Sequence, residues 1–143
     1  MRPSPPTIRA ATCADLPCIQ AIRHGTSENR LLDPARAPDA LVAWYLAEAI
    51  FLVSEAHEDV RGFVCANHQT GLIWALFVQR EAQGRGHGTA LLGAALDRLR
   101  WLGHRQAFLS TGAGTGAAAF YRARGWRCMG LDLEGDAAFV LPL

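Results

Sequence analysis

Glycine occupies alternate positions in the short segment QGRGHGT, which spans residues 83–89. Because glycine loses more conformational freedom on folding than any other residue, such a run indicates that something must approach the backbone closely. A helix that begins near His87 would present unpaired N–H groups and a partial positive charge at its first turn. Without side chains at Gly84, Gly86 and Gly88, a diphosphate can lie against those amides, so the segment predicts an anion-binding loop.

Two better-known phosphate-binding motifs do not fit this segment. A P-loop requires a lysine followed by a hydroxyl residue, and that pair is absent from the segment. A dinucleotide fingerprint would place a third glycine where Thr89 stands and an acidic residue at the end of the next strand, near Ser110, and neither is present. Close packing of a helix on a sheet is the purely structural alternative for the three glycines.

The glycine segment and a second motif further along the chain together resemble one family. In VQREAQGRGHGTALL, Gln83, Gly86 and Gly88 match the pattern of the coenzyme A loop of the GNAT superfamily of acyl-CoA-dependent N-acetyltransferases. The later AAAFYRARGW resembles the superfamily's second motif, a helix with Ala-x-x-Phe-Tyr that ends in glycine and an aromatic residue. The expected order of elements agrees as well, so the resemblance covers essentially the whole chain. It implies acetyl-CoA as the co-substrate and no metal.

The resemblance also implies which residues hold the coenzyme. The strand at 75–78 would be splayed and would bind the pantetheine arm through its backbone, while the amides from Gln83 to Thr89 would hold the diphosphate. One position departs from the superfamily, because the asparagine that many members carry seven residues before the tyrosine is Gly114 here. We expect either a lower affinity for the coenzyme or a substitute contact from Thr115. The complete set of expected coenzyme-binding residues is Leu76, Phe77, Val78, Gln83, Gly84, Arg85, Gly86, His87, Gly88, Thr89 and Thr115.

Acetyl transfer from a thioester to an amine needs a polarised carbonyl group and a proton for the leaving thiolate. Tyr121, in the second motif, is the expected general acid, by resemblance and by its chemistry. A backbone N–H near Leu76 or Phe77 is expected to polarise the carbonyl group. The side chain of His87 is expected to face solvent from the loop.

The acceptor amine is expected to bind beside the loop that follows the first helix, because in the superfamily that segment covers the splayed strands. In SENRLLDP, Glu28 and Asp33 could attract a cationic amine and Asn29 could orient it, although a merely solvated polar loop is an equal alternative. The strand at 71–78 has no acidic residue, so the general base is expected to be a water chain or one of these two carboxylates. A small-molecule amine, a peptide N-terminus, a lysine side chain and an aminoacyl group all remain open as acceptors.

The elements that must position these residues follow from hydrophobic periodicity and from glycine and proline breaks. We expect strands at 7–12, 49–56, 60–67, 71–78, 105–111, 127–133 and 137–143, helices at 15–25, 39–49, 87–102 and 114–126, and a polar loop at 26–38. Short breaks favour antiparallel hairpins, whereas the helix at 87–102 would join two parallel strands of one sheet by a right-handed crossover. The predicted fold is therefore α/β, with a mixed, largely antiparallel six- to seven-stranded sheet, helices on both faces and, by resemblance to GNAT proteins, splayed central strands.

The composition favours one small domain. The chain has 143 residues, with 14 Lys or Arg against 13 Asp or Glu, which suits a single N-acetyltransferase-like domain over 1–143 with a frayed segment at 1–6. A net charge of +1 argues against nucleic acid as a partner. The first ten residues do not form a signal peptide and no apolar run is long enough to span a membrane, so we expect a cytoplasmic protein with no membrane partner.

The sequence thus predicts an acetyl-CoA-dependent N-acetyltransferase that moves an acetyl group to a primary amine of a small molecule or peptide by direct transfer. A non-catalytic acyl-CoA sensor would keep the same loop, and a toxin that acetylates aminoacyl-tRNA is disfavoured by the charge. A homodimer remains open. The four scattered cysteines predict neither a zinc site nor a disulfide framework, but reduced and mostly buried thiols.

Overall fold

The computed structural model describes residues 5–25, 44, 46 and 49–143. In chain order the elements are β1 (Thr7–Ala10), η1 (Cys13–Asp15), α1 (Leu16–His24), β2 (Ile50–Ala56), β3 (Asp59–Ala66), β4 (Ile73–Val78), η3 (Arg80–Ala82), α3 (His87–Trp101), β5 (Gln106–Gly112), α4 (Gly116–Ala123), β6 (Arg127–Leu131) and β7 (Asp136–Pro142). The predicted loop at 26–38 lies outside the described residues, and so does most of the predicted helix at 39–49.

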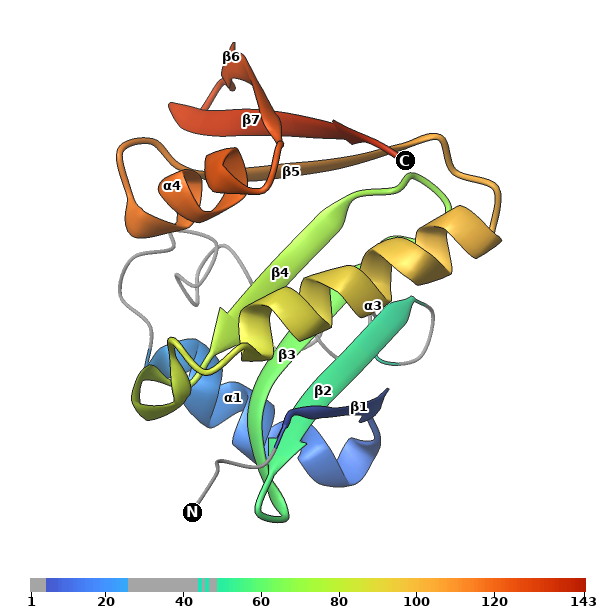
Figure 1. The fold of residues 1–143 in the computed structure, drawn as a ribbon, viewed down its shortest axis with the longest axis vertical. Helices are drawn as coiled ribbons and strands as arrows, with labels where there is room; N and C mark the ends of the chain where they lie inside the picture. Colours follow the sequence, from blue (N-terminus) through green and yellow to red (C-terminus); the bar gives the residue numbers. More distant parts are fainter. Residues whose placement is uncertain (1–4, 26–43, 45, 47–48) are drawn as a thin grey trace.

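The seven strands form two antiparallel sheets, in the orders β1-β2-β3-β4 and β5-β7-β6 (Figure 1). α3 connects β4 to β5, and the one β-bridge between these parts of the described chain is an isolated parallel bridge from Leu72, just before β4, to Phe108 of β5. The mixed α/β fold with splayed central strands is therefore confirmed. The prediction of a single sheet of six to seven strands, with the helix at 87–102 joining two of its parallel strands, is corrected by the structure. α3 (His87–Trp101) joins strands of two antiparallel sheets that diverge from this bridge, because pairing between β4 and β5 does not continue beyond it.

Helices cover both faces of the four-stranded sheet, as the alternation along β2 shows. Ile50 and Leu52 belong to a core cluster that includes the apolar face of α3, whereas Phe51 and Val53 belong to a second cluster with Ile19 of α1. Successive strand residues point to opposite faces, so α1 and α3 lie on opposite sides of the sheet. The cluster on the α3 side also contains residues of α4, β5 and β7, and so joins the two sheets.

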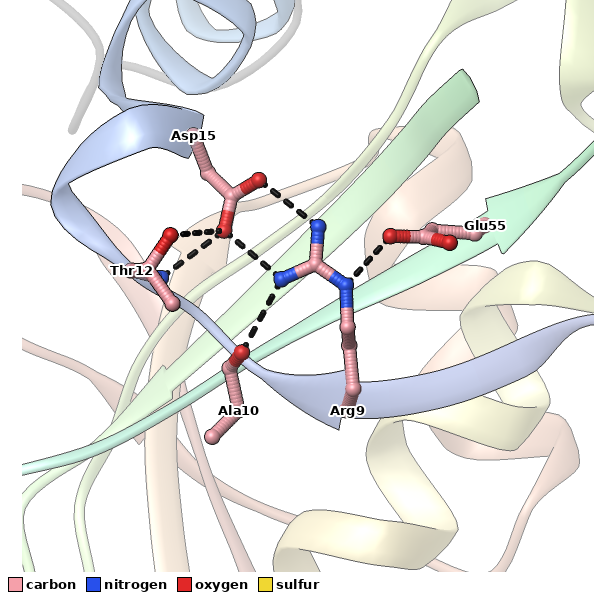
Figure 2. Close-up of polar contacts among 5 residues, drawn as sticks. All are labelled: Arg9, Ala10, Thr12, Asp15 and Glu55. Atoms are coloured by element: carbon pink, nitrogen blue, oxygen red, sulfur yellow. Dashed lines mark hydrogen bonds and ion pairs between the residues drawn. The ribbon is translucent and has the colours of Figure 1, made fainter. Parts of the chain in front are cut away.

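A polar cluster fixes the beginning of the chain to β2 (Figure 2). The guanidinium of Arg9 donates two hydrogen bonds of 2.8 Å to the Asp15 carboxylate and bonds Glu55 of β2 through Nε. Asp15 also accepts a 2.8 Å hydrogen bond from the backbone N–H of Thr12, in a capping box that starts η1. The hydrogen bonds from Arg9 lower the pKa of Asp15 from 3.8 to about 2, although burial opposes the shift.

The burial of the four cysteines differs from the prediction. Cys13, Cys18 and Cys128 are exposed, and only Cys65 is buried, so the prediction of mostly buried thiols is wrong. Cys13 and Cys18 lie in short helices that present them to solvent, and Cys128 lies on the exposed strand β6. Within the described residues, no helix is long and apolar enough to cross a membrane, and no group of His, Cys, Asp and Glu side chains is arranged to hold a metal ion.

Candidate active site

A groove of about 620 Å³ brings the two sequence motifs together. Its walls come from the end of β4, the loop and first turn of α3, and one side of α4. The lining residues are Leu76, Phe77, Val78, Ala82, Gln83, Gly84, Gly86, His87, Gly88, Thr89, Gly116, Ala117, Phe120, Tyr121 and Arg124. Segments about 30 residues apart in the sequence therefore share one cavity.

Two of the three glycines are required by the backbone itself. Gly84 and Gly86 have φ angles of 78° and 90°, and a Cβ atom at either would meet nothing within 4 Å. Both therefore adopt the left-handed region that favours glycine, beside open space. Gly88 differs, because a Cβ there would lie 3.6 Å from the ring of Phe120 and 3.7 Å from Val78, which is ordinary van der Waals contact. Gly84 and Gly86 therefore shape the loop, whereas neither the backbone nor the packing requires glycine at position 88.

The first turn of α3 leaves backbone donors unpaired within the helix. No side chain caps this terminus, and the first intrahelical bond runs from Ala90 N to Gly86 O at 3.0 Å. The amides of His87, Gly88 and Thr89 therefore have no acceptor one turn earlier in the helix. Together with the partial positive charge at the helix end, they form a site for an anion such as a phosphate.

Among the described residues, the backbone of β4 near its end is paired on one side only. Gln79 N donates to Arg61 O at 2.7 Å, and Phe77 lies opposite Phe63 in the register with β3. Because the hydrogen-bonding direction alternates along a strand, the backbone groups of Phe77 face β3 and those of Leu76 face away from it. Of the two amides expected to polarise a carbonyl group, that of Leu76 is the one on the open edge.

Val78 shares this open edge with Leu76, since the two residues are two positions apart. The side chain of Gln83 folds back across it, and its Nε2 donates to Val78 O at 3.3 Å. The edge therefore offers alternating N–H and C=O groups to an extended ligand, in the manner of a strand partner. A ligand that uses Val78 O would share this acceptor with the Gln83 side chain or displace it.

Tyr121 lies in the groove lining and is packed among aromatic rings. Only 7% of the residue is exposed, and its ring meets those of Phe120, Trp126 and Phe139 at centroid distances of 5.2, 5.7 and 6.1 Å. Burial raises the pKa of the Tyr121 hydroxyl well above its usual value, with a small opposing effect from Arg124. The hydroxyl therefore keeps its proton throughout the neutral range and is available as a hydrogen-bond donor.

His87 is buried, so the expectation that it faces solvent is wrong. Its residue is 3% exposed, and Nδ1 lies 2.9 Å from the Oγ of Ser54 on β2. Burial lowers the pKa of His87, and the charges of Arg61 and Arg85 lower it further. The lowered pKa favours a neutral imidazole at neutral pH, and the contact with Ser54 connects the start of α3 to β2.

Several predicted site residues lie elsewhere. The side chain of Arg85 borders a separate cavity of about 160 Å³, on the other side of His87. The predicted acceptor residues Glu28, Asn29 and Asp33 lie outside the described residues. Among the residues assigned to the coenzyme, those from Leu76 to Val78 and from Gln83 to Thr89, apart from Arg85, border the groove.

Thr115, which was expected to bind the coenzyme, does not border the groove and is instead the residue that caps the start of α4. Its hydroxyl donates to Gly112 O at 2.7 Å and accepts from Ala118 N at 3.2 Å, as the N-cap of the helix. Gly114, which replaces the superfamily's asparagine, has a φ of 74° beside open space. Asparagine tolerates this left-handed conformation better than most residues, so the backbone at this position would also accommodate an asparagine.

Sequence reasoning missed part of the groove lining on α4. The groove lies along one face of α4, the face that carries Tyr121. Helical periodicity places positions 116, 117, 120 and 124 on that same face, so it could have revealed them. Ala82 follows β4 in η3 and gave no comparable signal. The missed lining residues are Ala82, Gly116, Ala117, Phe120 and Arg124.

Known proteins share both the sequence pattern and this fold. The model of the acetyltransferase (GNAT) family matches residues 19–126. A GCN5-related N-acetyltransferase from Rhodopseudomonas palustris superposes with a TM-score of 0.85 at 19% identity, over 100% of this chain and 99% of that chain. None of the curated proteins matches the chain in sequence.

Two further solved structures carry a coenzyme. The PaiA N-acetyltransferase from Thermoplasma acidophilum, in complex with coenzyme A, has a TM-score of 0.79 at 16% identity, over 98% of this chain and 100% of that chain. The putative acetyltransferase yncA from Salmonella typhimurium, with acetyl-CoA, has a TM-score of 0.75 at 22% identity, over 98% and 95%. At these identities the likeness establishes a shared fold. Because the family model spans most of the chain, the protein belongs to the acetyltransferase (GNAT) family and is an acyltransferase.

Proposed function

We propose that the protein transfers the acetyl group of acetyl-CoA directly to a primary amine of a small molecule or peptide. One observation carries the proposal: the uncapped first turn of α3 opens into a groove that continues along the free edge of β4 to Tyr121. The order of an anion site, an extended backbone edge and a protonated hydroxyl corresponds to the order of diphosphate, pantetheine and thioester along the coenzyme.

Coenzyme binding would use backbone groups at both ends of the groove. The amides of His87, Gly88 and Thr89 would take the diphosphate, and the edge at Leu76 and Val78 would pair with the amides of the pantetheine arm. The two coenzyme-bearing relatives, from Thermoplasma and Salmonella, support this use of the shared fold.

The chemistry follows from two donors near the end of the arm. The amine nitrogen attacks the thioester carbonyl carbon, and the N–H of Leu76 stabilises the charge that develops on the carbonyl oxygen. The new C–N bond forms, the C–S bond breaks, and sulfur leaves with the electron pair as a thiolate. Tyr121 donates a hydrogen bond to that thiolate, while the proton released by the amine passes to solvent. Tyr121 does not transfer its proton completely, because its pKa lies above that of a thiol, about 8.5.

Direct transfer is supported by the absence of a thiol nucleophile from the described groove lining. The buried Cys65 is not part of this lining, and burial raises the pKa of its thiol. The lining also contains no carboxylate among the described residues, so none of these side chains would act as the base. The amine would lose its proton to solvent and then attack as its free base. We place the acceptor beside the segment that carries Glu28, Asn29 and Asp33, on the basis of the resemblance and the charge of these residues.

Thiol release from acetyl-CoA in the presence of a panel of amines and peptides tests the proposal, with calorimetric titration of CoA alongside. Binding of CoA together with amine-dependent thiol release is the expected result. Binding without release for any amine would identify a coenzyme sensor instead, and absence of CoA binding would refute the proposal. Mass spectrometry of a metabolite pool incubated with acetyl-CoA would then identify the acceptor.

A further inference from the structure

The separate cavity that Arg85 borders, of about 160 Å³, shares a wall with the groove. His87 and Ala82 border both cavities, whereas the other lining residues come from the end of β2, the β2–β3 turn, β3, η3 and the loop before α3. Apart from two alanines, the lining consists of titratable or charged residues, namely His57, Arg61, Glu81, Arg85 and His87. The lining thus has two guanidinium groups and one carboxylate, and we call this space the basic cavity.

The two arginines of the basic cavity differ in their partners. The Arg61 guanidinium donates to Gln79 Oε1 at 2.9 Å and to the exposed carboxylate of Asp59 at 3.3 Å, and these contacts fix its position. The side chain of Arg85 forms no hydrogen bond or ion pair with a residue in the described part of the chain. Because a guanidinium has five N–H donors, both arginines keep donors for a ligand.

Both guanidinium charges act on the buried ring of His87. Burial lowers the pKa of the imidazole most, and the charges of Arg61 and Arg85 lower it further. Only 3% of His87 is exposed, its Nδ1 contacts Ser54 Oγ, and its Nε2 has no hydrogen-bond partner among the described residues. Two positive charges therefore lie close to a buried polar group with a spare ring nitrogen, and an anion beside them would reduce their repulsion.

We propose that the basic cavity is a second anion site, which binds a small phosphate or carboxylate ligand separate from the coenzyme. Arg61 and Arg85 would bind its oxygen atoms through charge-assisted hydrogen bonds. When Ser54 donates to Nδ1, the neutral imidazole of His87 carries its proton on Nε2 and offers a further donor at the shared wall. The cavity has the volume of about five water molecules in the liquid, so it admits one phosphate or small carboxylate but no nucleotide.

A different occupant, the ribose phosphate of CoA, would give a different result. CoA would then displace an ion from the basic cavity, whereas dephospho-CoA, which lacks this phosphate, would leave the ion bound. A separate ligand site predicts that the ion stays bound in the presence of either compound, with an affinity lowered only by repulsion between the two anions. The comparison therefore separates the proposal from coenzyme binding.

The test is an NMR titration with inorganic phosphate and with malonate, followed at the backbone amides of residues 81–87, in a buffer without other oxyanions. The wild type should bind at least one of them saturably, and the one that binds more tightly identifies the ligand as a phosphate or a carboxylate. Arg85→Gln should weaken this binding about 10- to 100-fold, the range expected for lost hydrogen bonds to a charged group. Glu81→Gln should strengthen it, because the substitution removes the one carboxylate of the described lining.

Arg80→Gln is the matched control, because Arg80 also lies in η3 and is exposed but does not border the basic cavity. Its anion affinity should stay within about twofold of the wild type. A loss in this control equal to that in Arg85→Gln would show a general effect of surface charge and overturn the proposal. No saturable binding, unchanged affinity in Arg85→Gln, or displacement of the ion by CoA would overturn it as well. The proposed function does not depend on these outcomes, since titration of CoA in the absence of phosphate tests it separately.

Discussion

Replacing Tyr121 with phenylalanine removes one hydroxyl group from the groove and leaves the aromatic ring in place. The ring packs against Phe120, Trp126 and Phe139, and phenylalanine preserves all three contacts. We therefore expect the melting temperature and the affinity for CoA to stay close to those of the wild type. Any loss of turnover would then report on the hydroxyl rather than on packing.

The expected size of that loss follows from the protonation state. Because burial raises the pKa of Tyr121 above that of the leaving thiol, the hydroxyl stabilises the thiolate as a hydrogen-bond donor instead of protonating it. Removing one such donor from a developing anion costs about 10²- to 10³-fold in kcat, or roughly 3–4 kcal/mol. The KM for acetyl-CoA should change little, since the interaction forms only as the C–S bond breaks.

The assay is thiol release at saturating acetyl-CoA, from about pH 7 to about pH 10, for the wild type and Tyr121→Phe. The kcat of the wild type and that of Tyr121→Phe should depend on pH in the same way at alkaline pH, because the hydroxyl remains protonated over this range. A variant with near wild-type kcat would refute the assignment of Tyr121 to the leaving group. An alkaline fall that disappears in the variant would instead show an ordinary tyrosine pKa and complete proton transfer.

The remaining predictions concern the loop, the N-terminal cluster and the buried histidine. Gly86→Val should weaken CoA binding by more than about tenfold in calorimetry, whereas Gly103→Val, which imposes similar strain at a φ of 94° outside the groove, should lower stability without changing affinity. Asp15→Asn should lower the free energy of unfolding by about 2 kcal/mol at pH 7, the equivalent of a pKa of about 2 against 3.8. The folded chain favours the Asp15 carboxylate, so in urea titrations this difference should shrink as the pH falls from 3.8 towards about 2, and a constant difference would contradict the ion pair. The unfolded chain protonates His87 more readily than the folded chain, so stability should fall as the pH drops below 6.5 and level off below the folded pKa; His87→Asn, which keeps a polar partner for Ser54, should lose this part of the pH dependence.

The parts of the site that sequence analysis predicted depend on local signals. Positive φ at Gly84 and Gly86 and the start of a helix near His87 are encoded within a few residues, so the loop could be located without knowledge of the fold. The N-cap role of Thr115 is equally local and could have been predicted from a threonine that precedes an alanine-rich helix. The expectation that Thr115 contacts the coenzyme depends instead on its position next to Gly114, where many members of the superfamily carry an asparagine.

The parts that could not be predicted depend on partners distant in sequence. The burial of His87 requires Ser54, which lies 33 residues earlier on β2 and gives no sign of a partner in the sequence. The division of the strands into two sheets depends on where β4 and β5 stop pairing, and hydrophobic periodicity indicates strands but not their neighbours. The placement of Arg124 over Phe120 and beside Thr89 likewise requires α3 and α4 to be packed first.

The edge of β4 that is unpaired among the described residues also bears on association with other chains. An exposed strand edge is a template for pairing with a neighbouring molecule, and proteins commonly protect such edges with charge, proline or a covering element. Here the backbone groups of Leu76 and Val78 lie in a groove walled by α3 and α4, where a slender ligand arm fits more readily than a strand with side chains on both faces. The groove therefore leaves a strand edge accessible to a narrow ligand while its walls limit the approach of another strand.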